Sequence, residues 1–221
     1  MSRPPGPSRI SLLFYRCIRN LVVAFCRIYW REQVTGRQHV PATGAFILAP
    51  VHRSNIDTPL VAAVTTRRLR YMGKDSIWKV HWVGAVFTAL GAFPVRRGRA
   101  DREALRRCVE VLEGGEALVL FPEGSRRSGP TVEEVFEGAA YLAARTGAPI
   151  VPVGIGGSEA AMPRGARFIR PVRTRVVVGA PLRPPAGPEG SRVARRAVRE
   201  LTAELQGALQ RLLDEAAVSP R

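Results

Sequence analysis

The chain has 221 residues, the size of one α/β domain with a sizeable core, so a second full domain is not expected. A hydrophobic content of 46% and a charged content of 24% are ordinary for a globular protein, which excludes wholesale disorder and a polytopic membrane protein. The net charge of +16 comes almost wholly from arginine, and it predicts a surface that attracts phosphate on nucleic acid, on anionic lipid or on a substrate.

Residues 1–7, MSRPPGP, predict a disordered tail, and residues 8–32 predict an amphipathic helical segment that associates with membranes. The apolar run of this segment is interrupted by Arg16, Arg19 and Arg27. It therefore has neither the continuous apolar length of a membrane span nor the pattern of a signal peptide. Two interpretations remain for it, namely a helix that lies in a membrane interface and a helix packed on the core of its own domain.

Short apolar segments alternate with longer segments of helical spacing between residues 33 and 186, which is the expected extent of an α/β domain. The expected strands are residues 45–49, 69–72, 93–95, 117–121, 150–155 and 175–178. The alternation predicts an α/β fold, a single domain with a largely parallel or mixed sheet flanked by helices, in which ligands gather at the carboxyl ends of the strands. An amphipathic C-terminal helix is expected over residues 187–216.

The cysteines, Cys17, Cys26 and Cys108, are odd in number and widely spaced. They predict neither a disulfide framework nor a zinc site, and they indicate a reducing, cytosolic setting. No metal is expected in the functional site.

The stretch APVHRSNIDTPL, residues 49–60, places several polar residues directly after the first expected strand. Pro50 would end that strand, so His52 would lie in the turn at its carboxyl end, where active sites of parallel sheets form. Asp57 is followed by a proline and an apolar run, which is typical of a helix N-cap. The same carboxylate could fold back onto the imidazole, fix its tautomer and stabilise the imidazolium. Both roles stay open for Asp57.

Three further stretches end an expected strand in the same way. They are GAFPVRRG at 91–98, LVLFPEGSRRSG at 118–129 and APIVPVGIGG at 148–157. Together with VHRSNID at 51–57, these blocks resemble the motifs of the lysophosphatidate and glycerol-phosphate acyltransferase family, the H-x-x-x-x-D enzymes of phospholipid synthesis. Val51 departs from the asparagine that is frequent in this family before the histidine, and the second block matches loosely.

The resemblance implies acyl transfer from a thioester, either acyl-CoA or acyl-carrier protein, to a hydroxyl on a glycerol phosphate backbone, without a cofactor. It implies His52 as the general base on the acceptor hydroxyl, a role that typically contributes ~10²–10⁴ in rate, with Asp57 orienting the ring. Lysophosphatidate is the expected acceptor, and glycerol 3-phosphate or another lysolipid stays open.

Basic side chains of the later blocks are candidates for binding the acceptor phosphate, because a guanidinium matches phosphate geometry. They are Arg97 and Arg126, followed by Arg96 and Lys74. Glu123, Gly124 and Ser125 would shape the turn around the phosphate, with Gly124 letting backbone amides approach it. A structural role for Glu123 as a hydrogen-bond acceptor stays open beside substrate contact, and Arg127 is interpreted as a solvated neighbour.

Nucleic-acid binding is the strongest alternative of another class, but the chain lacks zinc-finger spacing, an RNA-recognition signature and interleaved aromatic and basic residues, so no nucleic-acid partner is expected. A serine hydrolase is a second alternative, against which the absence of G-x-S-x-G argues.

Two further segments have two interpretations each. The apolar residues between 78 and 90 line an acyl channel or form core. The arginines of the acid-free run 160–188 bind anionic lipid or are solvated. Peripheral attachment to the anionic cytoplasmic face of the plasma membrane is expected.

Overall fold

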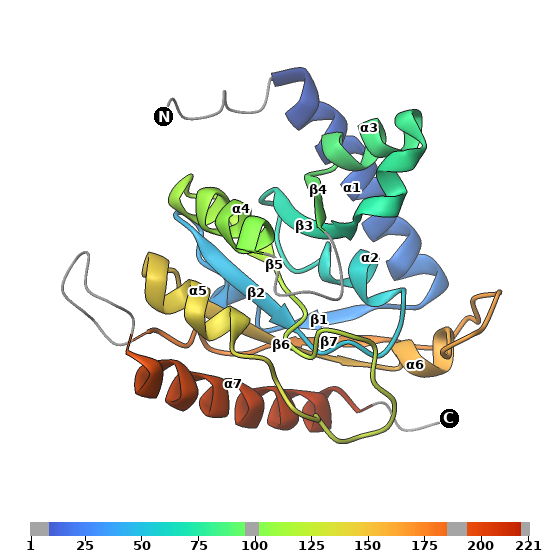
Figure 1. Cartoon of the computed structure of the whole chain (residues 1–221). Coiled ribbons are helices and arrows are strands. Elements are labelled where there is room, and N and C mark those ends of the chain that lie inside the picture. The colour runs from blue at the N-terminus through green and yellow to red at the C-terminus, as the bar shows by residue number, and fades with distance from the viewer. Residues whose placement is uncertain (1–8, 96–101, 185–193, 218–221) are drawn as a thin grey trace.

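A computed structural model describes residues 9–95, 102–184 and 194–217, which build a mixed seven-stranded sheet with helices on both faces (Figure 1). The strands are β1 (Gln33–Thr35), β2 (Phe46–Pro50), β3 (Leu69–Lys74), β4 (Ala92–Val95), β5 (Ala117–Val119), β6 (Ile150–Gly156) and β7 (Arg175–Val178). Their order in the sheet is β1-β7-β6-β2-β5-β3-β4. The strands from β6 to β4 in this order are parallel, whereas β7 is antiparallel to β6. The predicted fold class is confirmed.

All six expected strands are present, and β7 has the predicted bounds. The central strand β2 is buried along its whole length, as expected for a parallel strand covered on both faces. Sequence patterning missed β1, because its three residues at the sheet edge are too short to show a period of two.

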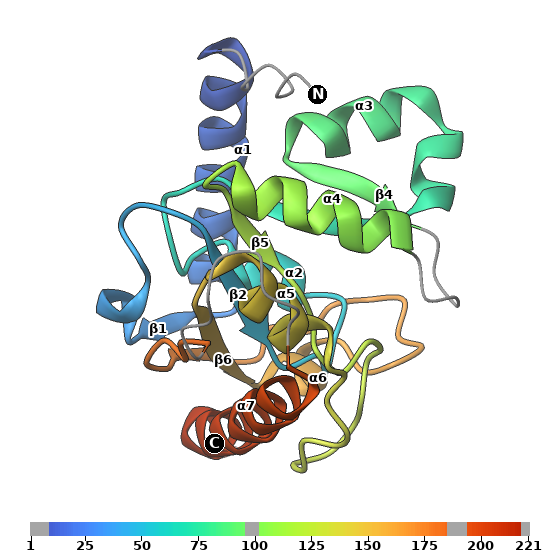
Figure 2. The ribbon, with the colours of Figure 1, turned by 60° about the vertical axis from the view of Figure 1, so that its left-hand side comes forward.

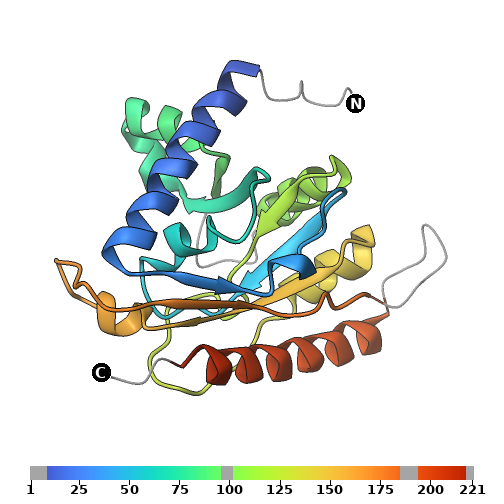
Figure 3. The same ribbon diagram turned by 180° about the vertical axis from the view of Figure 1, so that it is seen from behind.

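The helices form one layer on each face of the sheet (Figures 2 and 3). They are α1 (Arg9–Tyr29), α2 (Asp57–Val61), α3 (His81–Ala89), α4 (Arg102–Glu113), α5 (Gly138–Thr146), α6 (Ser158–Ala161) and α7 (Arg195–Ala216), with short 3-10 helices η1 (Arg37–His39) and η2 (Asp75–Lys79). α4, α5 and α7 lie side by side on one face, and α1 and α2 pack together on the other. α7 packs directly on β6, where a side chain at Gly154 or Gly156 would collide with the α7 backbone.

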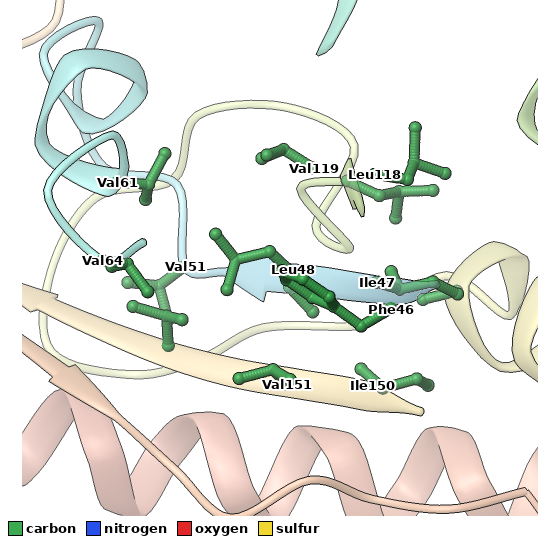
Figure 4. Packing of buried hydrophobic residues seen from close by; sticks show 14 of the residues in the cluster. Phe46, Ile47, Leu48, Val51, Val61, Val64, Leu118, Val119, Ile150 and Val151 are labelled. Atoms are coloured by element: carbon green, nitrogen blue, oxygen red, sulfur yellow. The ribbon is translucent and has the colours of Figure 1, made fainter. Parts of the chain in front are cut away.

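The hydrophobic core surrounds β2. Phe46, Ile47 and Leu48 of this strand are fully buried, and Figure 4 shows them between Leu118 of β5 and Ile150 of β6. The β2 side chains therefore fix the end of the strand from which the turn at His52 departs.

The N-terminal helix α1 packs on the core of its own domain, as one of its two interpretations predicted, and the membrane interpretation stays a prediction. One face, with Tyr15, Val23 and Cys26, is buried on the domain, while large apolar side chains such as Leu21 and Ile28 on the opposite side are exposed. Among the described residues, no helix is long and apolar enough to cross a membrane. The expected tail at residues 1–7 lies outside the described residues.

The structure also describes the expected C-terminal helix and the apolar stripe between residues 78 and 90. α7 lies within the predicted C-terminal helix, of which residues 187–193 are outside the described part of the chain. The stripe between residues 78 and 90 is not core as a whole, because Trp82 on α3 is 73% exposed and Val86 is also exposed.

Candidate active site

Two turns meet at the carboxyl edge of the sheet, because β2 and β5 are parallel neighbours. The turn after β2 carries His52, and the turn after β5 carries Glu123. The backbone amide of His52 donates to Glu123 Oε2 at 2.8 Å, and the amide of Arg127 donates to the carbonyl of His52 at 2.8 Å. Two segments far apart in the chain are thus joined on both sides of the histidine, since His52 and Glu123 are 71 residues apart.

His52 and Asp57 form the pair expected from their spacing. His52 Nδ1 lies 2.9 Å from Asp57 Oδ2, and the carboxylate is fully buried while 14% of the imidazole surface is exposed. The same carboxylate oxygen accepts the backbone amides of Arg53 and Ser54, each at 2.7 Å. Asp57 therefore holds both the ring and the peptide backbone of the turn.

The N-cap interpretation of Asp57 is wrong. Ile56 occupies the N-cap position of α2, and no side chain caps this helix. The Asp57 carboxylate instead points back to amides that precede the helix.

The Asp57 contact also defines which nitrogen of His52 is free to react. An ionised carboxylate only accepts hydrogen bonds, so Nδ1 carries the proton and Nε2 presents its lone pair. One face of the imidazole stacks on Phe121, with ring centroids 4.0 Å apart and planes 24° apart. No other described residue forms a hydrogen bond with Nε2, so this atom is available to a ligand.

A buried ion pair between Arg53 and Glu123 lies beneath these turns. Arg53 Nη1 is 2.7 Å from Glu123 Oε1 and 2.8 Å from Oε2, and the two side chains are 2% and 0% exposed. The guanidinium also donates to the carbonyls of Gly129 and Thr131. Arg53 was not singled out from the sequence, since only the fold shows that its partner is a carboxylate 70 residues away.

The structure favours the structural role for Glu123 over contact with substrate, because its carboxylate is fully buried and engaged by Arg53 and His52. Gly124 and Ser125 are exposed at the tip of the turn. Gly124 has φ +66°, and a Cβ there would lie 2.7 Å from the Phe136 ring, so this turn requires glycine.

The predicted phosphate ligands differ in what surrounds them. Arg126 is half-buried, and within the described residues its guanidinium has no hydrogen bond or ion pair. Its neighbour Arg127 forms an ion pair with Glu133 at 2.9 Å. Arg96 and Arg97 lie outside the described residues, as does the side chain of Lys74, the last residue of β3.

Burial shifts the pKa of several groups that lie outside the turns after β2 and β5. Burial raises the pKa of Cys26 and of Cys108 to about 12, which keeps both thiols protonated at neutral pH. Burial also raises the pKa of Glu32, beside the end of α1, to about 7. The described residues contain no cluster of three His, Cys, Asp or Glu side chains that could hold a metal ion.

The α/β fold matches that of a solved protein of similar size. The crystal structure of the 1-acyl-sn-glycerophosphate acyltransferase PlsC from Thermotoga maritima aligns with a TM-score of 0.72 and 22% sequence identity, covering 95% of this chain and 89% of that one. At this identity the likeness shows the fold.

The sequence places the chain in a family. The family model described as Acyltransferase matches residues 31–156, more than half of the 221 residues, and the chain belongs to this family. The 1-acyl-sn-glycerol-3-phosphate acyltransferase of Bacillus subtilis is 25% identical over 171 residues, which are 76% of this chain and 82% of the relative. A chloroplastic protein of the same name from Arabidopsis thaliana is 24% identical over 158 residues, 70% of this chain but 44% of the relative. The predicted family resemblance is confirmed.

Proposed function

We propose that this acyltransferase moves a fatty acyl group from acyl-CoA or acyl-carrier protein to the hydroxyl of lysophosphatidate, 1-acylglycerol 3-phosphate. The observation that carries the proposal is the His52–Asp57 pair at 2.9 Å, at the carboxyl end of a central parallel strand and with no hydrogen bond to Nε2 from the described residues. The name shared by the bacterial and chloroplastic relatives supports this acceptor over glycerol 3-phosphate or another lysolipid.

The chemistry needs one proton acceptor and no acyl-enzyme. His52 Nε2 takes the proton of the acceptor hydroxyl as its oxygen attacks the thioester carbonyl. The tetrahedral intermediate then collapses, the C–S bond breaks, and the imidazolium returns the proton to the leaving thiolate. The products are the new ester and the free thiol, and the buried Asp57 carboxylate stabilises the imidazolium between the two transfers.

The acceptor phosphate would bind Arg126. Its guanidinium is half-buried in the turn next to the histidine, and it is not neutralised by a described residue. Arg96, Arg97 and Lys74 remain further candidates from the ends of β3 and β4. Gly124 would let backbone amides of the turn approach the same phosphate.

Because the proposed acceptor is amphiphilic, the enzyme would meet it at a membrane surface. We propose that the protein attaches peripherally to the anionic cytoplasmic face of the plasma membrane. The exposed apolar side of α1 supports this, because large side chains such as Ile10, Leu21 and Ile28 lie in solvent along its length.

Release of free thiol from acyl-CoA or acyl-carrier protein, measured with and without each acceptor in detergent, tests the function. Thiol should appear only with an acceptor and fastest with lysophosphatidate, and His52→Ala should abolish it. His81→Ala, at the exposed start of α3, is the matched control and should keep full activity. Acceptor-dependent release that persists in a folded His52→Ala variant would refute the assigned base.

A further inference from the structure

The loop between α6 and β7, residues 162–174, exposes an unusual combination of side chains. At its tip Phe168 is 82% and Ile169 is 36% exposed. The exposed arginines of the loop are Arg164, Arg167, Arg170 and Arg173. Within the described residues none of these guanidinium groups has an ion pair or hydrogen bond, and the sequence contains no acidic residue from 160 to 188.

Hydrogen bonds to the backbone of this loop hold it in place, so the exposure of its apolar tip is fixed by the fold. The amide of Arg170 donates to the carbonyl of Ala161 at 2.8 Å. The Tyr29 hydroxyl donates to the carbonyl of Ile169 at 3.2 Å, and Trp30 Nε1 donates to that of Arg170 at 3.1 Å. The loop is therefore attached directly to the end of α1.

The same attachment makes the tip continuous with the exposed apolar side of α1. Phe25, 45% exposed, stacks on Tyr29 with ring centroids 5.2 Å apart, and Tyr29 in turn bonds the backbone of Ile169. Ile28, one residue before Tyr29, is 79% exposed. Figure 3 shows the loop, in orange, beside the C-terminal end of α1.

We propose that the loop 162–174 and the last two turns of α1 form a docking surface for an anionic lipid bilayer. The exposed arginines of the loop bind lipid phosphates, and Phe168 and Ile169 insert between the headgroups. Exposed apolar tips flanked by basic side chains suit a bilayer, which offers anionic phosphate above apolar chains. The choice of a bilayer over another polyanion rests in part on the proposed transfer to a lipid.

The loop is also tied to the proposed catalytic turn. Ser54 Oγ donates to the carbonyl of Met162 at 2.8 Å, and the Ser54 amide donates to Asp57. A bilayer held at the loop would therefore have a fixed position relative to His52.

Sedimentation of the full chain with phosphatidylcholine vesicles, with and without 30 mol% phosphatidylglycerol, tests the docking surface. The double variant Arg164→Gln/Arg167→Gln should weaken binding to the anionic vesicles roughly 25-fold, since each arginine near an anionic surface contributes about fivefold. Phe168→Ala should weaken binding to both kinds of vesicle, by roughly 10-fold.

Arg195→Gln/Arg196→Gln on α7 removes the same charge elsewhere and should change vesicle binding less than twofold. Equal losses from the two arginine pairs, or unchanged binding after Phe168→Ala, would overturn the docking surface. Loop variants that lose affinity for single-stranded RNA but keep vesicle binding would overturn it in favour of a nucleic-acid surface. Thiol release in detergent should be unchanged in the loop variants, so a failure of the proposed activity is seen separately from a failure of docking.

Discussion

Removing Arg53 tests whether its buried ion pair with Glu123 holds the turns after β2 and β5 together. In Arg53→Met, the Glu123 carboxylate would stay fully buried without a counterion, and the carbonyls of Gly129 and Thr131 would lose their guanidinium donor. Breaking a buried pair in this way costs about 3–5 kcal/mol, a large part of the roughly 5–15 kcal/mol that stabilises a domain. At roughly 2–4 °C per kcal/mol, the Tm should fall by about 6–20 °C.

A second substitution separates the cost of the stranded charge from the cost of lost packing. Arg53→Met/Glu123→Gln removes both charges and keeps an amide oxygen that can accept the His52 amide. Urea unfolding followed by circular dichroism should show that the double variant regains much of the stability lost by Arg53→Met. Thiol release should nevertheless stay roughly 10-fold or more below wild type, because the arginine that joins both turns is gone.

Arg106→Met is the matched control, since its ion pair with Glu110 on α4 is largely exposed and contributes about 0.5 kcal/mol or less. The proposed role of the ion pair is refuted if the free energy of unfolding of Arg53→Met is within about 1 kcal/mol of the wild-type value. It is also refuted if the double variant is as unstable as the single variant, because the stranded carboxylate would then not be the source of the loss.

Three further changes probe other parts of the molecule. Asp57→Asn should lower kcat roughly 100-fold with a small change in Tm, measured by thiol release and thermal unfolding, because the imidazolium loses its anionic partner. Arg126→Ala should raise KM for lysophosphatidate about 10–100-fold, and Arg126→Lys should restore only part of the loss, as steady-state kinetics would show. Glu32 has a folded pKa of about 7, above the ordinary 4.5, so wild-type stability should fall as pH rises from 4.5 to 7. Glu32→Gln should unfold like wild type at pH 5 and be up to about 3 kcal/mol more stable at pH 8, as urea titrations would show.

The part of the site that is local in sequence was predictable. His52 and Asp57 are five residues apart at the end of a strongly apolar strand, so the strand, the turn and the contact could be inferred together. The direction in which Asp57 uses its carboxylate was not predictable, because an N-cap and a turn that folds backward share the same residue pattern. Only the backbone conformation distinguishes them.

The non-local part could not be predicted from patterning. The pairing of Arg53 with Glu123 depends on β2 and β5 being neighbours, and alternation of strands and helices gives the sheet type but not the strand order. The edge strand β1 was missed for a related reason, since its place beside β7 is set by tertiary contacts of three residues. Both the Arg53–Glu123 pair and the β1–β7 pairing depend on tertiary contacts between segments that are distant in the sequence.

On a chain with a net charge of +16, composition alone cannot say which arginine binds a phosphate. The arrangement of partners narrows the choice, because a guanidinium already neutralised by the protein gains less from a second anion. Arg53 and Arg127 are engaged by Glu123 and Glu133, whereas Arg126 is half-buried without a partner among the described residues. The turn after β5 thus contributes a structural carboxylate that bonds the histidine backbone and a cation that no described residue neutralises, a division of charge that suits the proposed general base acting on a phosphorylated alcohol.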